Sequence, residues 1–159
     1  MQDKRESLKE YIKLNQQDFY RLAFSYTKNS DAALDVVQES IVKAIDKIGS
    51  LKDTAYLKTW FYRILVNESL MHLRRSKRLV LVESIEDGEP GCGEDLAQSM
   101  DMYNAIQALE VKIRTVIILR FFEDMKLEEI AVITKTNLST VKSRLYKGLE
   151  LLKVSIGEE

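Results

Sequence analysis

Residues that break helices are scarce in this chain, and most of them lie together. Six Gly and one Pro occur in 159 residues, and four of these seven (Gly88, Pro90, Gly91 and Gly93) fall in one acidic stretch. We therefore expect long helices on both sides of a weakly ordered linker. The predicted fold class is all-α: an N-terminal helical domain over residues 1–79, an acidic flexible linker over 80–101, and a C-terminal domain over 102–159 that contains a helix-turn-helix.

Apolar residues recur at helical spacing in the N-terminal segment. They predict one helix over about residues 8–26 and a second over about 34–48, with Ser30 as its cap and Gly49 after its end. A third helix should begin between Asp53 and Tyr56 and run on into the basic stretch 72–78. Trp60 is expected to lie in the core of this domain, because a single Trp at helical spacing usually does.

The C-terminal segment has the spacing of a helix-turn-helix. One long helix is predicted over 102–123, followed by shorter helices at 127–134 and from residue 139 onward. Ser139 is expected to cap the last helix, whose packing stripe is Val141, Leu145, Leu149 and Leu152. Its opposite side carries hydroxyl and basic side chains, which is the arrangement of a helix that reads DNA, although an ordinary amphipathic surface helix would show the same stripe.

Charge is segregated along the chain, although the formal net charge is only −1. Residues 56–78 carry a net charge of +5, residues 79–101 carry −7, and residues 134–159 carry +2. Basic segments of this kind suggest binding to a polyanion, whereas the alternative is that they are merely solvated faces. The pairing of the basic helix with a preceding helix favours DNA binding.

Several classes of function find no support in the sequence. Cys92 is the only cysteine and His72 the only histidine, so neither an internal disulfide nor a familiar zinc site is expected. No cofactor, metal or catalytic constellation is predicted, and the chain is not expected to be an enzyme. The charged N-terminus and the short apolar runs predict a cytoplasmic protein without a membrane span.

Three motifs occur in an order that resembles the bacterial sigma factors of the extracytoplasmic-function (ECF) type. They are DVVQESIVKAI (35–45), TWFYRILVN (59–67) and EEIAVITKTNLSTVKSRL (128–145). The stretches DFYRLAFSY (18–26) and IILRFFEDMKLEEIA (117–131) look like the SigV-type branch of that group. The resemblance covers nearly the whole chain and implies promoter-specific transcription initiation with RNA polymerase, in a regulon for envelope stress.

The resemblance also implies roles for individual residues. Asp35, Gln38 and Glu39 would bind polymerase, whose clamp and flap regions are the contact surfaces. The minus-ten promoter element would be held by Leu51 and Lys52 of a loop, by Asn67 at a flipped base, and by the basic residues Arg74, Arg75, Lys77 and Arg78. The minus-thirty-five element would be read by Thr140, Lys142, Ser143, Arg144, Tyr146 and Lys147.

The chain departs from the family pattern at several positions. Lys52 and Asp53 stand where the loop usually has Arg-Gly, and Lys135 replaces the usual Gly of the helix-turn-helix turn. Lys126 replaces a common Ser cap, which leaves Asp124 as a substitute. If Lys135 must adopt a positive φ, the cost relative to glycine is about 1 kcal/mol.

The expected partners are core RNA polymerase, promoter DNA and an anti-sigma factor, which in this family is often anchored in a membrane. Such an inhibitor would bind both domains, and the linker is expected to let the domains change their relative placement cheaply. Two alternatives remain: a stand-alone helix-turn-helix regulator with a sensing N-terminal domain, and a helical adaptor that binds acidic proteins.

Overall fold

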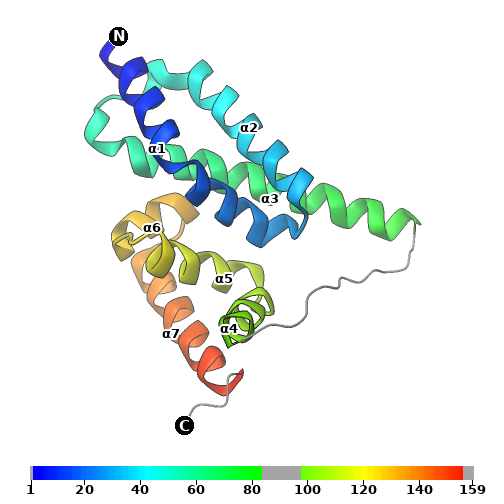
Figure 1. Ribbon diagram of the computed structural model, residues 1–159. Coiled ribbons are helices and arrows are strands. Elements are labelled where there is room, and N and C mark those ends of the chain that lie inside the picture. The colour runs from blue at the N-terminus through cyan, green and yellow to red at the C-terminus, as the bar shows by residue number, and fades with distance from the viewer. Residues whose placement is uncertain (1, 84–97, 156–159) are drawn as a thin grey trace.

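The computed structural model describes residues 2–83 and 98–155 (Figure 1). Its elements are α1 (Gln2–Thr27), α2 (Ser30–Lys47), η1 (Ile48–Ser50), η2 (Thr54–Tyr56), α3 (Leu57–Glu83), α4 (Gln98–Gln107), α5 (Val111–Ile117), η3 (Ile118–Phe122), α6 (Leu127–Thr134) and α7 (Leu138–Ser155). The described ranges contain no strand, and the all-α prediction is confirmed. Most of the predicted linker, residues 84–97, lies outside the described residues, and its two ends, 80–83 and 98–101, are helical.

The first unit, α1 to α3, packs around aromatic rings. The ring centroids of Phe19 on α1 and Phe61 on α3 lie 4.5 Å apart, and the ring of Tyr62 meets that of Phe19 edge-on at 5.7 Å. Helix α1 kinks at Asn15, whose side-chain amide donates to the backbone oxygen of Tyr11 at 2.9 Å. The ion pair between Lys43 and the buried Glu68 joins α2 to α3.

The second unit, α4 to α7, differs from the prediction of one long helix over 102–123. The chain leaves the helix after Gln107, and Glu110 is extended, with φ −61° and ψ 146°. The buried guanidinium of Arg114 donates to the backbone oxygens of Gln107 and Leu109, at 3.0 and 2.9 Å. The backbone oxygens freed at the break are therefore hydrogen-bonded by Arg114, which helical periodicity could not reveal.

Three predicted helix starts are wrong in their capping residue. Asn29, and not Ser30, caps α2, because its side chain accepts from the N–H of Ala32 at 2.9 Å. Asn137 accepts in the same way from Thr140 at 2.8 Å, so Ser139 is inside α7. At α6 the carboxylate of Glu129 accepts from the N–H of Lys126 at 2.9 Å, and Asp124 is not the substitute cap.

The packing stripe of α7 also differs from the prediction at one position. Val141, Leu145 and Leu152 are buried as expected, whereas Leu149 is 40% exposed. Gly148 takes the inward position, where a Cβ would lie 2.8 Å from Cδ1 of Ile117 and 2.9 Å from Cγ2 of Ile113. The absence of a side chain thus lets α7 approach α5 closely, which an apolar-residue pattern cannot register.

The two units pack directly against each other. In Figure 1, α1 to α3 lie above α4 to α7, and α6 lies against α3. The C-terminal part of α3 projects beyond α2. A substantial contact between the units was not expected from the sequence. The linker had suggested that few contacts would have to be broken for the units to move apart.

Candidate functional site

Helix α2 presents a mixed apolar and polar face to solvent. Asp35, Gln38 and Glu39 are all exposed, as the sequence predicted. Beside them, Leu34, Val42 and Ile45 are 48%, 59% and 48% exposed. Apolar side chains gathered next to unpaired acceptors are typical of a protein-binding surface.

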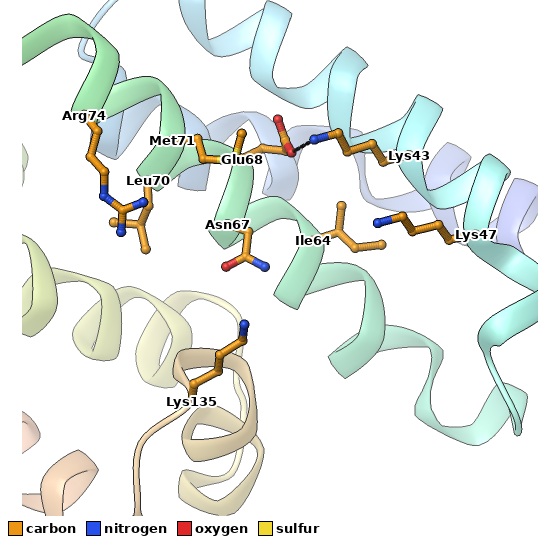
Figure 2. Close-up of a pocket in the computed structure, with 9 residues that line it drawn as sticks. All are labelled: Lys43, Lys47, Ile64, Asn67, Glu68, Leu70, Met71, Arg74 and Lys135. Carbon is orange, nitrogen blue, oxygen red and sulfur yellow. Dashed lines mark hydrogen bonds and ion pairs between the residues drawn. The ribbon is translucent and has the colours of Figure 1, made fainter. Parts of the chain in front are cut away.

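A second candidate site is a basic cleft between the two units, defined here by Lys47, Asn67, Arg74, Lys135 and Arg144. One part of it is a hollow of about 350 Å³ in which Asn67 and Arg74 on α3 face Lys135 after α6 (Figure 2). An adjoining hollow of about 280 Å³ also borders Asn67, Arg74 and Lys135 and adds Arg144 of α7. Predicted DNA-binding residues of both units therefore line one cleft.

The predicted minus-ten loop borders a different hollow. Lys52, Asp53 and the partly buried Trp60 line a space of about 460 Å³, which Glu128 and Glu129 of α6 also border. Asn67 lines the basic cleft instead, so the structure does not bring it together with the loop. The side chain of Leu51 borders the same hollow but is only 3% exposed and packs in the core, so it offers little surface to DNA in this arrangement.

The basic stretch at the end of α3 is accessible where it is described. The side chains of Arg74 and Arg75 are exposed, whereas those of Lys77 and Arg78 lie outside the described residues. Because α3 continues to Glu83, the backbone of this stretch is helical.

Helix α7 presents the predicted reading face to solvent. Lys142, Ser143, Tyr146 and Lys147 are exposed, and the Tyr146 side chain is 62% exposed. Thr140 and Arg144 are half-buried, with Arg144 in the basic cleft. Lys135, in the turn before α7, has φ 58° and ψ 43°, so the positive φ considered from the sequence is present.

Sequence reasoning missed a buried carboxyl group between the units. Glu123, just after η3, is 4% exposed and accepts from the hydroxyl of Tyr62 at 2.7 Å. Arg21 on α1 forms an ion pair with it at 3.4 Å, and Lys58 on α3 donates to its backbone oxygen at 2.9 Å. We call Arg21, Lys58 and Tyr62 the Glu123 socket. In the sequence Glu123 looks like any surface acid, and no local pattern marks it.

Burial alters the acidity of the groups in this contact. It raises the pKa of Glu123 above its usual range, although hydrogen bonds from Tyr62 and Arg21 partly oppose the rise. Burial and the neighbouring Glu123 carboxyl also raise the pKa of the Tyr62 hydroxyl. A carboxyl group kept from water in this way stabilises the contact only while its partners remain in place.

A second set of contacts joins the units near the end of α1. The hydroxyl of Tyr26 hydrogen-bonds to that of Thr115 on α5, and burial raises the pKa of Tyr26 to about 12. Thr115 donates its own proton to the backbone oxygen of Val111, so Tyr26 is the donor in this pair. Lys28 donates to the backbone oxygen of Gln107 at 3.2 Å.

Within 2–83 and 98–155, no three His, Cys, Asp or Glu side chains gather as metal ligands would. Over those ranges, too, no helix is long and apolar enough to cross a membrane.

Comparison with known proteins agrees with this division into two units. Residues 11–79 match the family model described as Sigma-70 region 2, and residues 99–152 match Sigma-70, region 4. The chain is 47% identical over 147 residues to the RNA polymerase sigma factor SigV of Bacillus subtilis, covering 91% of this chain and 88% of that protein. It is 27% identical over 164 residues to the ECF sigma factor SigW of the same organism, covering 93% and 88%.

Solved structures show the same fold. The sigma factor RpoE of Bartonella quintana, determined in complex with the anti-sigma factor NepR, has a TM-score of 0.80 and 26% identity over 94% of this chain and 96% of that one. CnrH, determined with the cytosolic domain of CnrY, has a TM-score of 0.71 at 18% identity, over 96% and 89%. This chain belongs to the extracytoplasmic-function group of the sigma-70 family. It acts as an RNA polymerase sigma factor.

Proposed function

We propose that the chain directs RNA polymerase to the promoters of an envelope-stress regulon, with the work divided between its two units. Residues 1–79 bind polymerase and the minus-ten element, residues 80–101 link the units, and residues 102–159 bind the minus-thirty-five element. The exposed mixed face of α2 is the observation that carries this proposal, because a regulator that only binds DNA has no need of it. The protein would work in the cytoplasm, where its polymerase is.

The α2 face fits a basic partner surface with apolar patches, such as the polymerase clamp. Val36 and Val37 anchor the helix inward, so Asp35, Gln38 and Glu39 are free to accept hydrogen bonds. Leu34, Val42 and Ile45 would supply most of the binding energy by leaving water. The second unit would contact the flap region of the polymerase.

Promoter contacts would be divided by chemistry. Asn67 can donate and accept toward the edge of a flipped base, while Lys52 and the basic stretch from Arg74 to Arg78 follow the phosphates. On α7, Ser143, Tyr146 and Lys147 reach base edges in the major groove, and Thr140, Lys142 and Arg144 hold the backbone. The exposure of Ser143, Tyr146 and Lys147 on one face of α7 supports this division.

The test is in vitro transcription with purified core polymerase and a library of promoters. A sigma factor yields defined transcripts that depend on this protein and share a minus-ten and a minus-thirty-five sequence. Binding of specific duplex DNA by the chain alone, with no such transcripts, would instead favour a stand-alone regulator. Transcripts independent of the protein would refute the proposal outright.

The role of Asn67 can be tested separately. Asn67→Ala should leave the fold and polymerase binding intact, because the side chain is exposed, but should reduce DNA opening in permanganate footprints. Asn104→Ala, at an exposed asparagine of α4, serves as the matched control. Normal opening by Asn67→Ala would remove Asn67 from the promoter site.

Regulation by an anti-sigma factor is supported by the solved complexes of RpoE with NepR and of CnrH with CnrY. An inhibitor that contacts both units and the α2 face would gain affinity from their linkage, up to ~100-fold or more. Cutting the chain within residues 86–95 should remove that gain, as measured by calorimetry with core polymerase as competitor. Equal affinity for cut and intact protein, or simultaneous binding of inhibitor and polymerase, would exclude this mode.

A further inference from the structure

Two kinds of contact lie on the boundary between the units. Glu123 of the second unit is held by the socket of the first, formed by Arg21, Lys58 and Tyr62. On another part of the same boundary, Asn67 and Arg74 face Lys135 and Arg144 across the basic cleft. Residues proposed to touch the two promoter elements thus face each other while the socket is occupied.

This arrangement does not match the geometry of a promoter. The minus-ten and minus-thirty-five elements are about 25 base pairs apart, which is roughly 85 Å of duplex at about 3.4 Å per step. The two units touch through α3 and α6, so they must separate before both elements can be bound at once. Separation also has to uncover the loop hollow, which Glu128 and Glu129 border in the closed arrangement.

We propose that the Glu123 socket is an intramolecular docking site, and that its occupation by Glu123 holds the free protein closed with its promoter-facing residues turned into the cleft. The proposal rests on the proposed function for the meaning of the cleft, but the docking itself does not. Every side-chain hydrogen bond or ion pair that Glu123 makes in the described structure goes to the first unit. The carboxyl group of Glu123 therefore serves to join the two units.

The surroundings of the socket make it selective for this turn of the second unit. Arg21 also donates to the backbone oxygen of Phe122 at 3.4 Å, and its guanidinium lies 5.4 Å from the Phe122 ring centroid. Lys58 recognises the backbone of Glu123, and Tyr62 its carboxyl group. The socket binds the Glu123 carboxyl group together with the backbone oxygens of Phe122 and Glu123, so another acidic side chain of the surface could not take the place of Glu123.

The test measures the separation of the units directly. Fluorescent dyes are attached in a Cys92→Ser background at Asp46→Cys on α2 and Lys153→Cys on α7, both exposed positions. Glu123→Ala should lower energy transfer and shift the ratio of open to closed protein by on the order of tenfold or more. Glu150→Ala removes an equal charge from exposed α7 and should leave transfer unchanged. Low transfer in the unmodified protein, or unchanged transfer in Glu123→Ala, would overturn the proposal.

Two further variants guard against loss of folding. Tyr62→Phe keeps the ring in the aromatic core and removes only the hydroxyl from the socket, so it should open the protein without loss of helicity. Glu123→Gln keeps an acceptor oxygen for Tyr62 and should remain mostly closed. If Glu123→Ala loses helical circular dichroism, Tyr62→Phe decides: unchanged transfer in that variant refutes the docking role.

A titration with labelled promoter DNA then tests the consequence of closure. Opened variants should reach half-maximal DNA binding at a lower protein concentration, by about the factor that opening contributes, because their basic residues no longer face into the cleft. Equal binding by closed and opened forms would show that closure withholds nothing. Failure of the chain to support any transcription would refute the proposed function and leave the dye result standing.

Discussion

The cores of the two units are built from different kinds of side chain. The first is built from three helices of 18 to 27 residues around the rings of Phe19, Phe61 and Tyr62. The second uses α-helices of 7 to 18 residues around an aliphatic core that includes Val116, Ile117, Leu119, Ile130, Ile133 and Val141. Large rings bury more surface per residue, so each of these three side chains contributes much to the first core, whereas in the second unit Gly148 lets the backbones of α5 and α7 come close.

The units also differ in how their turns are made. The second unit contains the π-helical turn η3 and two non-glycine residues of positive φ, Asp124 at 55° and Lys135 at 58°. The first contains one, Lys28, at the junction of α1 and α2. Over the described residues, the second unit therefore holds more positions of strained backbone than the first. Four substitutions and a change of pH can test these differences between the units.

The largest effect is expected from Phe61→Ala, in the centre of the aromatic cluster. Phe61 is fully buried, so its truncation should lower the free energy of unfolding of the first unit by about 3–5 kcal/mol. Leu14→Ala, at a position 80% exposed, should change it by less than about 0.5 kcal/mol. Chemical denaturation measures both, and a small effect of Phe61→Ala would mean that the rings are not the core of that unit.

Gly148→Ala tests the corresponding claim about the second unit. The new Cβ would lie 2.8 Å from Cδ1 of Ile117, so overpacking should cost about 1–3 kcal/mol despite the better helix propensity of alanine. Gly49→Ala in the first unit meets nothing within 4 Å and should be neutral or slightly stabilising. Thermal unfolding of the pair gives the comparison. Equal stability of the two variants would show that α5 and α7 are not closely packed.

Lys147→Ala tests whether the second unit reads bases. Loss of a direct contact should change the promoter preference at one position by about 1–3 kcal/mol, as measured by transcription from a library of minus-thirty-five variants. Arg144→Ala should instead weaken all promoters alike and reduce the salt dependence of binding. Uniform weakening by both substitutions would refute direct readout by Lys147.

Lys135→Gly tests the strain in the helix-turn-helix turn. Because glycine adopts a φ of 58° without penalty, the variant should stabilise the second unit by about 1 kcal/mol. Lys126→Gly, at a φ of −75°, should give no such gain and serves as the control. The thermal midpoints of the two variants would settle the matter, and a loss of stability in Lys135→Gly would mean that the lysine side chain outweighs the strain.

The smallest effect is expected from pH, which acts on the contact between the units. Because the pKa of Glu123 is raised in the closed form, protonation of its carboxyl group stabilises that form. This stabilisation is complete below the usual pKa of a glutamic acid and is lost as pH rises through the raised pKa. The groups facing Glu123 are Tyr62, Arg21, Lys58, Asp18 and Tyr11. Energy transfer between the dyes should fall with rising pH in this window, and in Glu123→Gln it should not. A rise would reverse the sign of the linkage.

The helical class, the two units and the faces exposed on α2 and α7 could be predicted from the sequence. These follow from periodicity and charge, which act locally along each helix, and from motif order. Residues such as Gln38 and Lys147 lie where the sequence placed them because an exposed helix face needs no distant partner.

Features that depend on contacts between distant residues could not be predicted and appear only in the folded structure. The break before α5 depends on the hydrogen bonds of Arg114. The close approach of α7 to α5 depends on the missing side chain of Gly148, and the burial of Leu51 depends on the packing of its loop. Above all, Glu123 is buried because Arg21, Lys58 and Tyr62, between 61 and 102 positions away, surround it. A carboxyl group has no periodic signature, so its partners become visible only when the two units meet.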